Sequence, residues 1–175
     1  MAQLPPRARW YHIDTNQHFA EWVAEQRDKG KREYASARYW ANGGSHLVGV
    51  KGELCYSWLT GQAIDLSVDP RGDNGADFPD GCDVKTSTFL SDPILKVPVG
   101  TTKWPRFFAL AVVDEKTNRG CIAGFATPDM VRAGRVRDFG HGKQYTLSVA
   151  ELKPPKRNDL WDANAALGLT EEDRP

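Results

Sequence analysis

Two aspartates flank a short turn near the middle of the chain, in the segment GADFPDGCDVK at residues 75–85. Pro79-Asp80-Gly81 is typical of a hairpin loop, so we expect Asp77 to lie opposite Asp83 on two antiparallel strands. Directly opposed residues on one face have Cβ atoms roughly 4.5–5.5 Å apart. Two carboxylates so close repel each other unless one is protonated or a cation lies between them. The spacing therefore predicts a cation site, and its oxygen ligands favour Mg²⁺ or Mn²⁺ over Zn²⁺.

Lys85 adds a second chemical group to this pair. The alternation of a strand places Asp83, Lys85 and Ser87 on one face. An ammonium group beside a metal can orient a water molecule, lower its pKa or stabilise the charge that develops on a phosphate, and the metal can polarise a phosphoryl oxygen. The segment thus contains the groups needed for metal-dependent hydrolysis of a phosphodiester. Ser87 could contact a phosphate or only solvent, so it stays outside the core site.

A helix and a strand are predicted ahead of this segment. Residues 45–61 fit an amphipathic helix that Ser45 can cap and Gly61 can end. Its apolar stripe consists of Leu47, Val50, Leu54 and Trp58. The alternating residues 63–69 predict a strand, followed by a turn or loop at 70–75.

The rest of the chain predicts a sheet with helices packed on it, an α/β (α+β) fold. Expected strands are 82–89, 106–114, 121–126 and 143–152, with a hairpin turn at 115–120. The strand at 106–114 is apolar enough to be buried on both faces. A short helix begins with Thr127 as its cap and Pro128 at its first position. One or two helices at 18–40, interrupted near Gly30, and a docked helix within 158–175 complete the prediction.

These residues resemble the signature of the PD-(D/E)XK nuclease superfamily, in which an acidic residue precedes a hairpin and acid-x-lysine follows it. Asp77 matches the first acid, Asp83 the second and Lys85 the lysine, while Glu53 matches the glutamate of an upstream helix. The order of elements over 45–126 agrees, although Ala76 stands where the family has proline. The resemblance implies a restriction-endonuclease-like mixed β-sheet core flanked by helices. It also implies that Asp77, Asp83 and Glu53 bind Mg²⁺ or Mn²⁺.

Two other aspartates, Asp73 and Asp80, compete for the role of first ligand, but their positions are more typical of turn residues. We expect one nuclease-like domain over 1–175. Its core is about 45–150, preceded by a helical segment at 1–44 and followed by a tail at 151–175.

Charge is unevenly distributed along a chain whose net charge is zero. Residues 51–100 carry 4 Lys and Arg against 8 Asp and Glu, whereas residues 101–145 carry 8 against 4. An acidic centre between basic flanks suits a cation site beside a bound polyanion, but ordinary surface variation gives the same pattern. Two basic clusters could contact DNA phosphates or be solvated loops: Lys96, Lys103 and Arg106, and then Arg132, Arg135 and Arg137.

Composition excludes several classes of protein. The 175 residues contain no apolar run of the roughly 18 residues that cross a bilayer, and the N-terminus has no signal-peptide pattern. The three cysteines, Cys55, Cys82 and Cys121, are odd in number and far apart, which argues against a disulfide framework or a zinc ribbon. We therefore expect an intracellular, cytoplasmic protein with buried thiols and no membrane partner.

The sequence predicts a Mg²⁺-dependent nuclease that cuts DNA, endonucleolytically and with structure selectivity or weak sequence specificity. The short chain leaves little room for a separate sequence-reading domain, and a homodimer would let two sites cut both strands. Two alternatives stay open. One is a non-catalytic nucleic-acid-binding or structural protein that keeps the nuclease fold, and the other is an enzyme of the same fold that acts on RNA.

Overall fold

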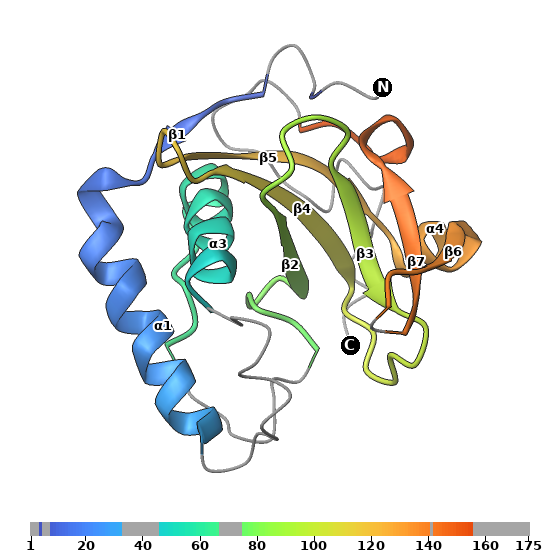
Figure 1. Ribbon diagram of the computed structural model, residues 1–175, viewed down its shortest axis with the longest axis horizontal. Helices are drawn as coiled ribbons and strands as arrows, with labels where there is room; N and C mark the ends of the chain where they lie inside the picture. Colours follow the sequence, from blue (N-terminus) through green and yellow to red (C-terminus); the bar gives the residue numbers. More distant parts are fainter. Residues whose placement is uncertain (1–3, 5–7, 33–45, 67–74, 141, 156–175) are drawn as a thin grey trace.

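A computed structural model describes residues 4, 8–32, 46–66, 75–140 and 142–155 of the chain. Helices and strands are mixed along it, and the strands form two sheets that lie against each other (Figure 1). The fold is therefore of the mixed α+β class, as the sequence predicted.

The central sheet has four strands in the order β1-β5-β4-β2. β4, Phe107–Asp114, pairs antiparallel with β5, Arg119–Ala126. On the other side of β4, β2, Cys82–Ser87, pairs in parallel with it. β1, Tyr11–His12, pairs antiparallel with β5. Almost every residue of β4 and β5 is buried, because elements cover both faces of the sheet. β2 is an edge strand, which leaves one of its sides open to other parts of the chain.

Two helices cover one face of this sheet. α3, His46–Thr60, packs on β2, β4 and β5, and α1, Gln17–Arg32, packs on α3 (Figure 1). A Cβ at Gly52 would lie 2.0 Å from Thr86 Oγ1 of β2, so only glycine permits this close approach. α3 ends at Gly61, which adopts a φ of 75° and donates its N–H to the Ser57 carbonyl at 2.7 Å. The predicted helix is confirmed, while Ser45 lies outside the described residues.

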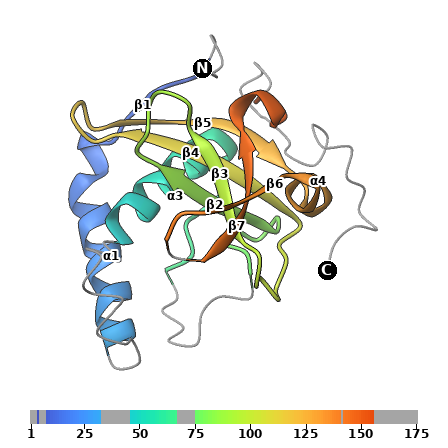
Figure 2. The ribbon, with the colours of Figure 1, turned by 45° about the vertical axis from the view of Figure 1, so that its right-hand side comes forward.

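A second, three-stranded sheet covers the opposite face, in the order β3-β7-β6 (Figure 2). β3 spans Ile94–Pro98, β7 spans Lys143–Ser148 and β6 spans Arg135–Asp138. The core between the two sheets includes Leu95, Val97, Leu147, Phe108, Leu110 and Val112. The other side chains of β4 point to α3 instead, which explains why β4 is apolar at successive positions.

Short helical segments lie at the connections. α4, Pro128–Ala133, is capped by Thr127, whose side chain accepts a hydrogen bond from Met130 N at 3.3 Å, as predicted. Single 3-10 turns occur at Asp14–Asn16 and Val149–Glu151, so the last part of the strand expected at 143–152 is a turn. Cys55, Cys82 and Cys121 are buried free thiols.

Several predicted elements need correction. The strand expected at 63–69 is wrong over residues 63–66, which form no strand, and residues 67–69 lie outside the described part. Within 63–66, Arg27 donates to the Asp65 carbonyl at 3.0 Å. α1 continues through Gly30, and residues 33–40 lie outside the described part. The expected C-terminal helix also lies outside it. The sequence reading missed β1, β3 and β6.

No helix in the described ranges is long and apolar enough to cross a membrane.

Candidate active site

A tight turn brings Asp77 back to the start of β2. Gly81 N–H donates to the Phe78 carbonyl at 2.9 Å, and Asp77 N–H donates to the Cys82 carbonyl at 2.7 Å. Gly81 has a φ of 84°, which favours glycine. The expected antiparallel strand pair is wrong, because Asp77 belongs to no strand and β2 pairs with β4 in parallel.

Asp77 nevertheless lies beside β2, at its open edge. Val84 N–H donates to Asp77 Oδ2 at 2.7 Å. Burial raises the pKa of the Asp77 carboxyl to about 8, and the negative charges of Asp83 and then Glu53 add to this rise. The hydrogen bond from Val84 N–H and the positive charge of Lys85 act in the opposite direction and lower the pKa. The influence of the Asp83 charge on Asp77 thus arises through a turn and not through facing strands.

Asp83 and Lys85 lie together on one face of β2. Their register partners on β4 are Phe108 and Leu110, whose side chains point to the second sheet. Lys85 Nζ forms an ion pair with the Asp83 carboxylate at 2.7 Å. The Lys85 side chain keeps 37% of its surface exposed, so solvent reaches the ammonium group. The predicted pairing of Asp83 with Lys85 on one face is confirmed.

Glu53 approaches Asp77 from the α3 side of the sheet. It is buried, and Arg27 of α1 binds both of its carboxylate oxygens, at 2.6 and 2.9 Å. Burial alone would lower the pKa of Arg27, but the hydrogen bond and charge of Glu53, together with Asp77 and Asp65, raise it above its usual value. These two hydrogen bonds fix the orientation of the Glu53 carboxylate, whose charge acts on Asp77.

Arg27 is the site residue that the sequence reading missed. It follows Ala20, Val23 and Ala24 at helical spacing, and these three are buried against α3. That spacing was the available signal, because it places position 27 on the buried face. An arginine there needs a carboxylate partner, and Glu53 is the acidic residue of α3.

In the described part of the chain, no three His, Cys, Asp or Glu side chains gather in an arrangement that could hold a metal ion. Two of the predicted ligands are paired with protein cations instead: Arg27 binds Glu53, and Lys85 binds Asp83. The donor chemistry still fits Mg²⁺ or Mn²⁺, since all three groups are carboxylates and Asp77 is buried beside two like charges. A metal held by all three would require Arg27 and Lys85 to give way.

Asp80 and Asp73 are the two aspartates that compete with Asp77 for the role of first metal ligand. Asp80 accepts hydrogen bonds from Tyr56 Oη and Gln62 Nε2, each at 2.5 Å, and from Cys82 N at 3.1 Å, so it ties α3 to the turn. Asp73 lies outside the described residues. Ser87 Oγ accepts the N–H of Phe89 at 3.2 Å.

The two predicted basic clusters are divided among several surfaces. Arg132 lies 4.1 Å from the centre of the Trp104 ring and pairs with Asp129, while Lys96 lies over Phe139. Lys103 and Arg106 instead line the glycine turns at 75 and 81. Arg135 and Arg137 are exposed on β6.

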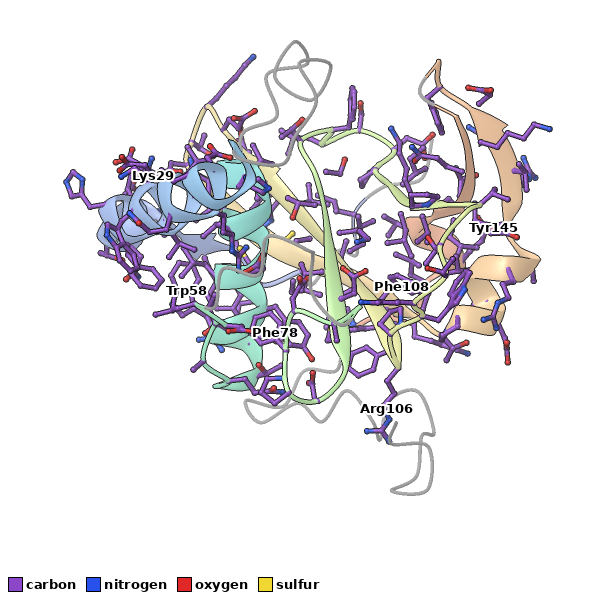
Figure 3. All side chains as sticks on the ribbon, turned by 90° about the horizontal axis from the view of Figure 1, so that it is seen from below. Lys29, Trp58, Phe78, Arg106, Phe108 and Tyr145 are labelled. Atoms are coloured by element: carbon purple, nitrogen blue, oxygen red, sulfur yellow. The ribbon has the colours of Figure 1, made fainter. Side chains whose placement is uncertain are left out.

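Side chains divide clearly between the two faces of the central sheet (Figure 3). Phe78, next to the site, lies on the side of α3 with Trp58, while Phe108 and Tyr145 lie on the side of the second sheet. Asp77 bonds the edge strand β2 at Val84, Glu53 belongs to α3, and Asp83 and Lys85 lie on the face of β2 that is turned to the second sheet.

No family model, no curated protein and no solved structure matches the chain. The resemblance to the PD-(D/E)XK superfamily therefore stays a prediction that depends on the short motif and on Glu53.

Proposed function

We propose that this protein is a metal-dependent nuclease that hydrolyses phosphodiester bonds in DNA, built on a restriction-endonuclease-like core. The observation that carries the proposal is that Asp77 is buried where the charges of Asp83 and Glu53 act on it, and that Lys85 is paired with Asp83. The charges of Asp83 and Glu53 disfavour ionisation of the buried Asp77 carboxyl, so a metal cation there would stabilise its charged form. A site built in this way, with a solvent-accessible ammonium group, favours a catalytic role.

Asp77 and Asp83 would hold the metal, Mg²⁺ or Mn²⁺. Glu53 would bind it directly or through water, or take part as a base. When bound, the metal supplies positive charge that stabilises the charge developing on the phosphate. Lys85 would move from Asp83 to the attacking water, which it orients and makes more acidic. Arg27 fixes the orientation of the Glu53 carboxylate through its two hydrogen bonds.

The substrate we propose is DNA, cut endonucleolytically with structure selectivity or weak sequence specificity. A homodimer would place two such sites on the two strands of a duplex. Sedimentation of the protein with and without DNA tests this assembly.

One observation favours a second candidate, a nucleic-acid-binding protein without turnover. Protein cations already neutralise Glu53 and Asp83, so the acidic turn has a structural role even without metal. Such a protein would bind DNA equally well in Mg²⁺ and in EDTA.

Cleavage of a substrate panel separates the two candidates. Supercoiled plasmid, linear duplex, single strand, flap, four-way junction and RNA are each incubated with Mg²⁺, Mn²⁺ or EDTA. We expect metal-dependent cutting of DNA, reduced roughly 10²- to 10³-fold in Lys85→Ala because the ammonium group acts on the transition state. Lys116→Ala, an exposed lysine in the β4–β5 turn, is the matched control and should cut normally.

Binding of Mn²⁺, measured by titration calorimetry, completes the test. Asp77→Asn should weaken it, while Asp129→Asn, an exposed carboxylate on α4, should not. DNA binding with no cutting under any condition would contradict the nuclease and support the second candidate.

A further inference from the structure

Two exposed aromatic rings surround a lysine on the second sheet. Lys96 Nζ lies 4.2 Å from the centre of the Phe139 ring and 5.8 Å from that of Phe89. Phe89 is 65% exposed and Phe139 is 37% exposed. Rings held at the surface around an ammonium group bury little apolar area, so their placement suits a ligand better than a core.

The strand register shows that this group shares a face with two arginines. Lys96 pairs with Thr146 of β7, which pairs with Arg135 of β6. Side chains of register partners point to the same face of a sheet, and Arg137 shares that face with Arg135. Leu95, Val97 and Leu147 occupy the opposite, inner face. The cations therefore lie on the outer face of the second sheet, which faces away from the central sheet in Figure 2.

This outer face is also hollowed. A pocket of about 450 Å³ is lined by Arg135, Arg137, Thr146 and Ser148, together with Asp92 and Glu151. Thr146 lines the pocket and is the register partner of Lys96, so the pocket and the lysine between the rings lie on neighbouring strands of one face. We call it the outer-sheet surface, defined by Phe89, Lys96, Arg135, Arg137 and Phe139.

The outer-sheet surface connects to the candidate active site through the end of β2. Ser87 lies on the same face of β2 as Lys85, and its hydroxyl accepts the N–H of Phe89. Phe89 is four residues beyond Lys85 in the chain, so the backbones of these two residues are at most roughly 13 Å apart. That distance is covered by two or three nucleotides of an extended single strand.

We propose that the outer-sheet surface binds single-stranded DNA, with bases stacked on Phe89 and Phe139 and phosphates beside Lys96, Arg135 and Arg137. Aromatic rings beside a cationic track are the features that hold unpaired bases without sequence preference. A duplex fits less well, since its bases are stacked on each other and offer no free ring faces. The choice of DNA rests on the proposed function, whereas the choice of a single strand rests on this surface alone.

Two carboxylates lie next to the cations and must be included in the charge balance. Glu151 accepts hydrogen bonds from Ser148 N and Oγ at 2.8 and 2.7 Å, so its carboxylate is directed to the backbone. Asp92 has a φ of 58°, a conformation that asparagine tolerates. Asp92→Asn should therefore keep the loop and tighten DNA binding, because it removes a negative charge from the pocket.

The test measures fluorescence anisotropy of labelled dT₂₀, rU₂₀ and a 20-base-pair duplex with the full chain in EDTA. Working without metal separates binding from cutting, so this experiment is independent of whether the nuclease proposal holds. We expect dT₂₀ to bind more tightly than the duplex. Phe89→Ala and Phe139→Ala should each weaken dT₂₀ binding roughly tenfold and Phe89→Trp should preserve it. Lys96→Ala should lower the slope of log K against log salt by about 0.7.

Trp22→Ala is the matched control, since Trp22 belongs to another exposed aromatic pair, stacked with Phe19 on α1. Unchanged dT₂₀ affinity in Phe89→Ala and Phe139→Ala, or an equal loss in Trp22→Ala, would overturn the proposal. Preference for the duplex would also overturn it. Tighter binding of rU₂₀ with the same dependence on the two rings would assign the surface to RNA and overturn the choice of DNA.

Discussion

Two ion pairs flank Asp77, and they differ in almost every physical respect. Arg27 and Glu53 form a two-point contact between helices, with 19% and 6% of their side-chain surfaces exposed. Lys85 and Asp83 lie on the sheet and meet through one ammonium group, with 37% and 14% exposed. The first pair is a fixed contact between α1 and α3, while the second is open to solvent.

The contrast between the two ion pairs shows how one cluster can contain both a pair that stabilises the fold and a pair that is able to take part in a reaction. Arg27 makes two hydrogen bonds to the Glu53 carboxylate and a third to the Asp65 carbonyl, so a change of partner breaks three contacts. The ammonium group of Lys85 is on a flexible side chain and exposed to solvent, so exchanging the Asp83 oxygen for another acceptor costs little free energy. We therefore assign Arg27 a positioning role and Lys85 the role of contacting water and substrate.

The largest expected effect on stability comes from the helix pair. Arg27→Ala leaves the Glu53 carboxylate buried and unpaired, which should lower the free energy of unfolding by about 3–5 kcal/mol. Urea denaturation measures this change, with Lys29→Ala, an exposed lysine on the same helix, as the control. Arg27→Met combined with Glu53→Leu should recover most of the loss. Equal stability of Arg27→Ala and Lys29→Ala would remove the distinction between the two pairs.

An intermediate effect concerns pH and the carboxyl between the pairs. The pKa of Asp77 is about 8 in the folded protein, well above the value of 3.8 for an exposed aspartate. The folded state therefore holds a proton that the unfolded state has lost, and this group's contribution makes stability fall as pH rises from about 4 to about 8.

Between pH 5.5 and 8.5 the slope from this one group should be at most about 1.4 kcal/mol per pH unit. Asp77→Asn should flatten it, since an amide stays neutral and its oxygen can still accept the Val84 N–H. Urea denaturation of both proteins at several pH values checks this expectation. Identical pH profiles would place the titration on another group.

The smallest effect is expected at the sheet pair. Asp83→Asn should change stability by less than about 1 kcal/mol, because an ion pair this open to solvent is well screened. Thermal melts at low and high salt provide the measurement. A loss as large as that in Arg27→Ala would mean that Lys85 is as firmly held as Arg27, and it would contradict the proposed mobility of Lys85.

The sequence alone determined the elements with strong local patterns. The helix at 46–60, the two central strands and the Thr127 cap follow from periodicity, apolar runs and capping chemistry, and the alternation of β2 placed Asp83 and Lys85 on one face. Strands β3 and β6 were missed because each is short and carries polar or proline residues. Their pairing with β7 supplies the stability that their own residues lack.

Tertiary structure alone decided how the charges are arranged. The sequence predicted that Asp77 and Asp83 lie close together, but only the packing of α1 on α3 places Arg27 on Glu53, because no local pattern records which helices meet. Only the strand order places β2 at the edge of the sheet, where Val84 N–H reaches Asp77. Long-range contacts depend on the fold of the whole chain, whereas helix and strand periodicity is set by neighbouring residues.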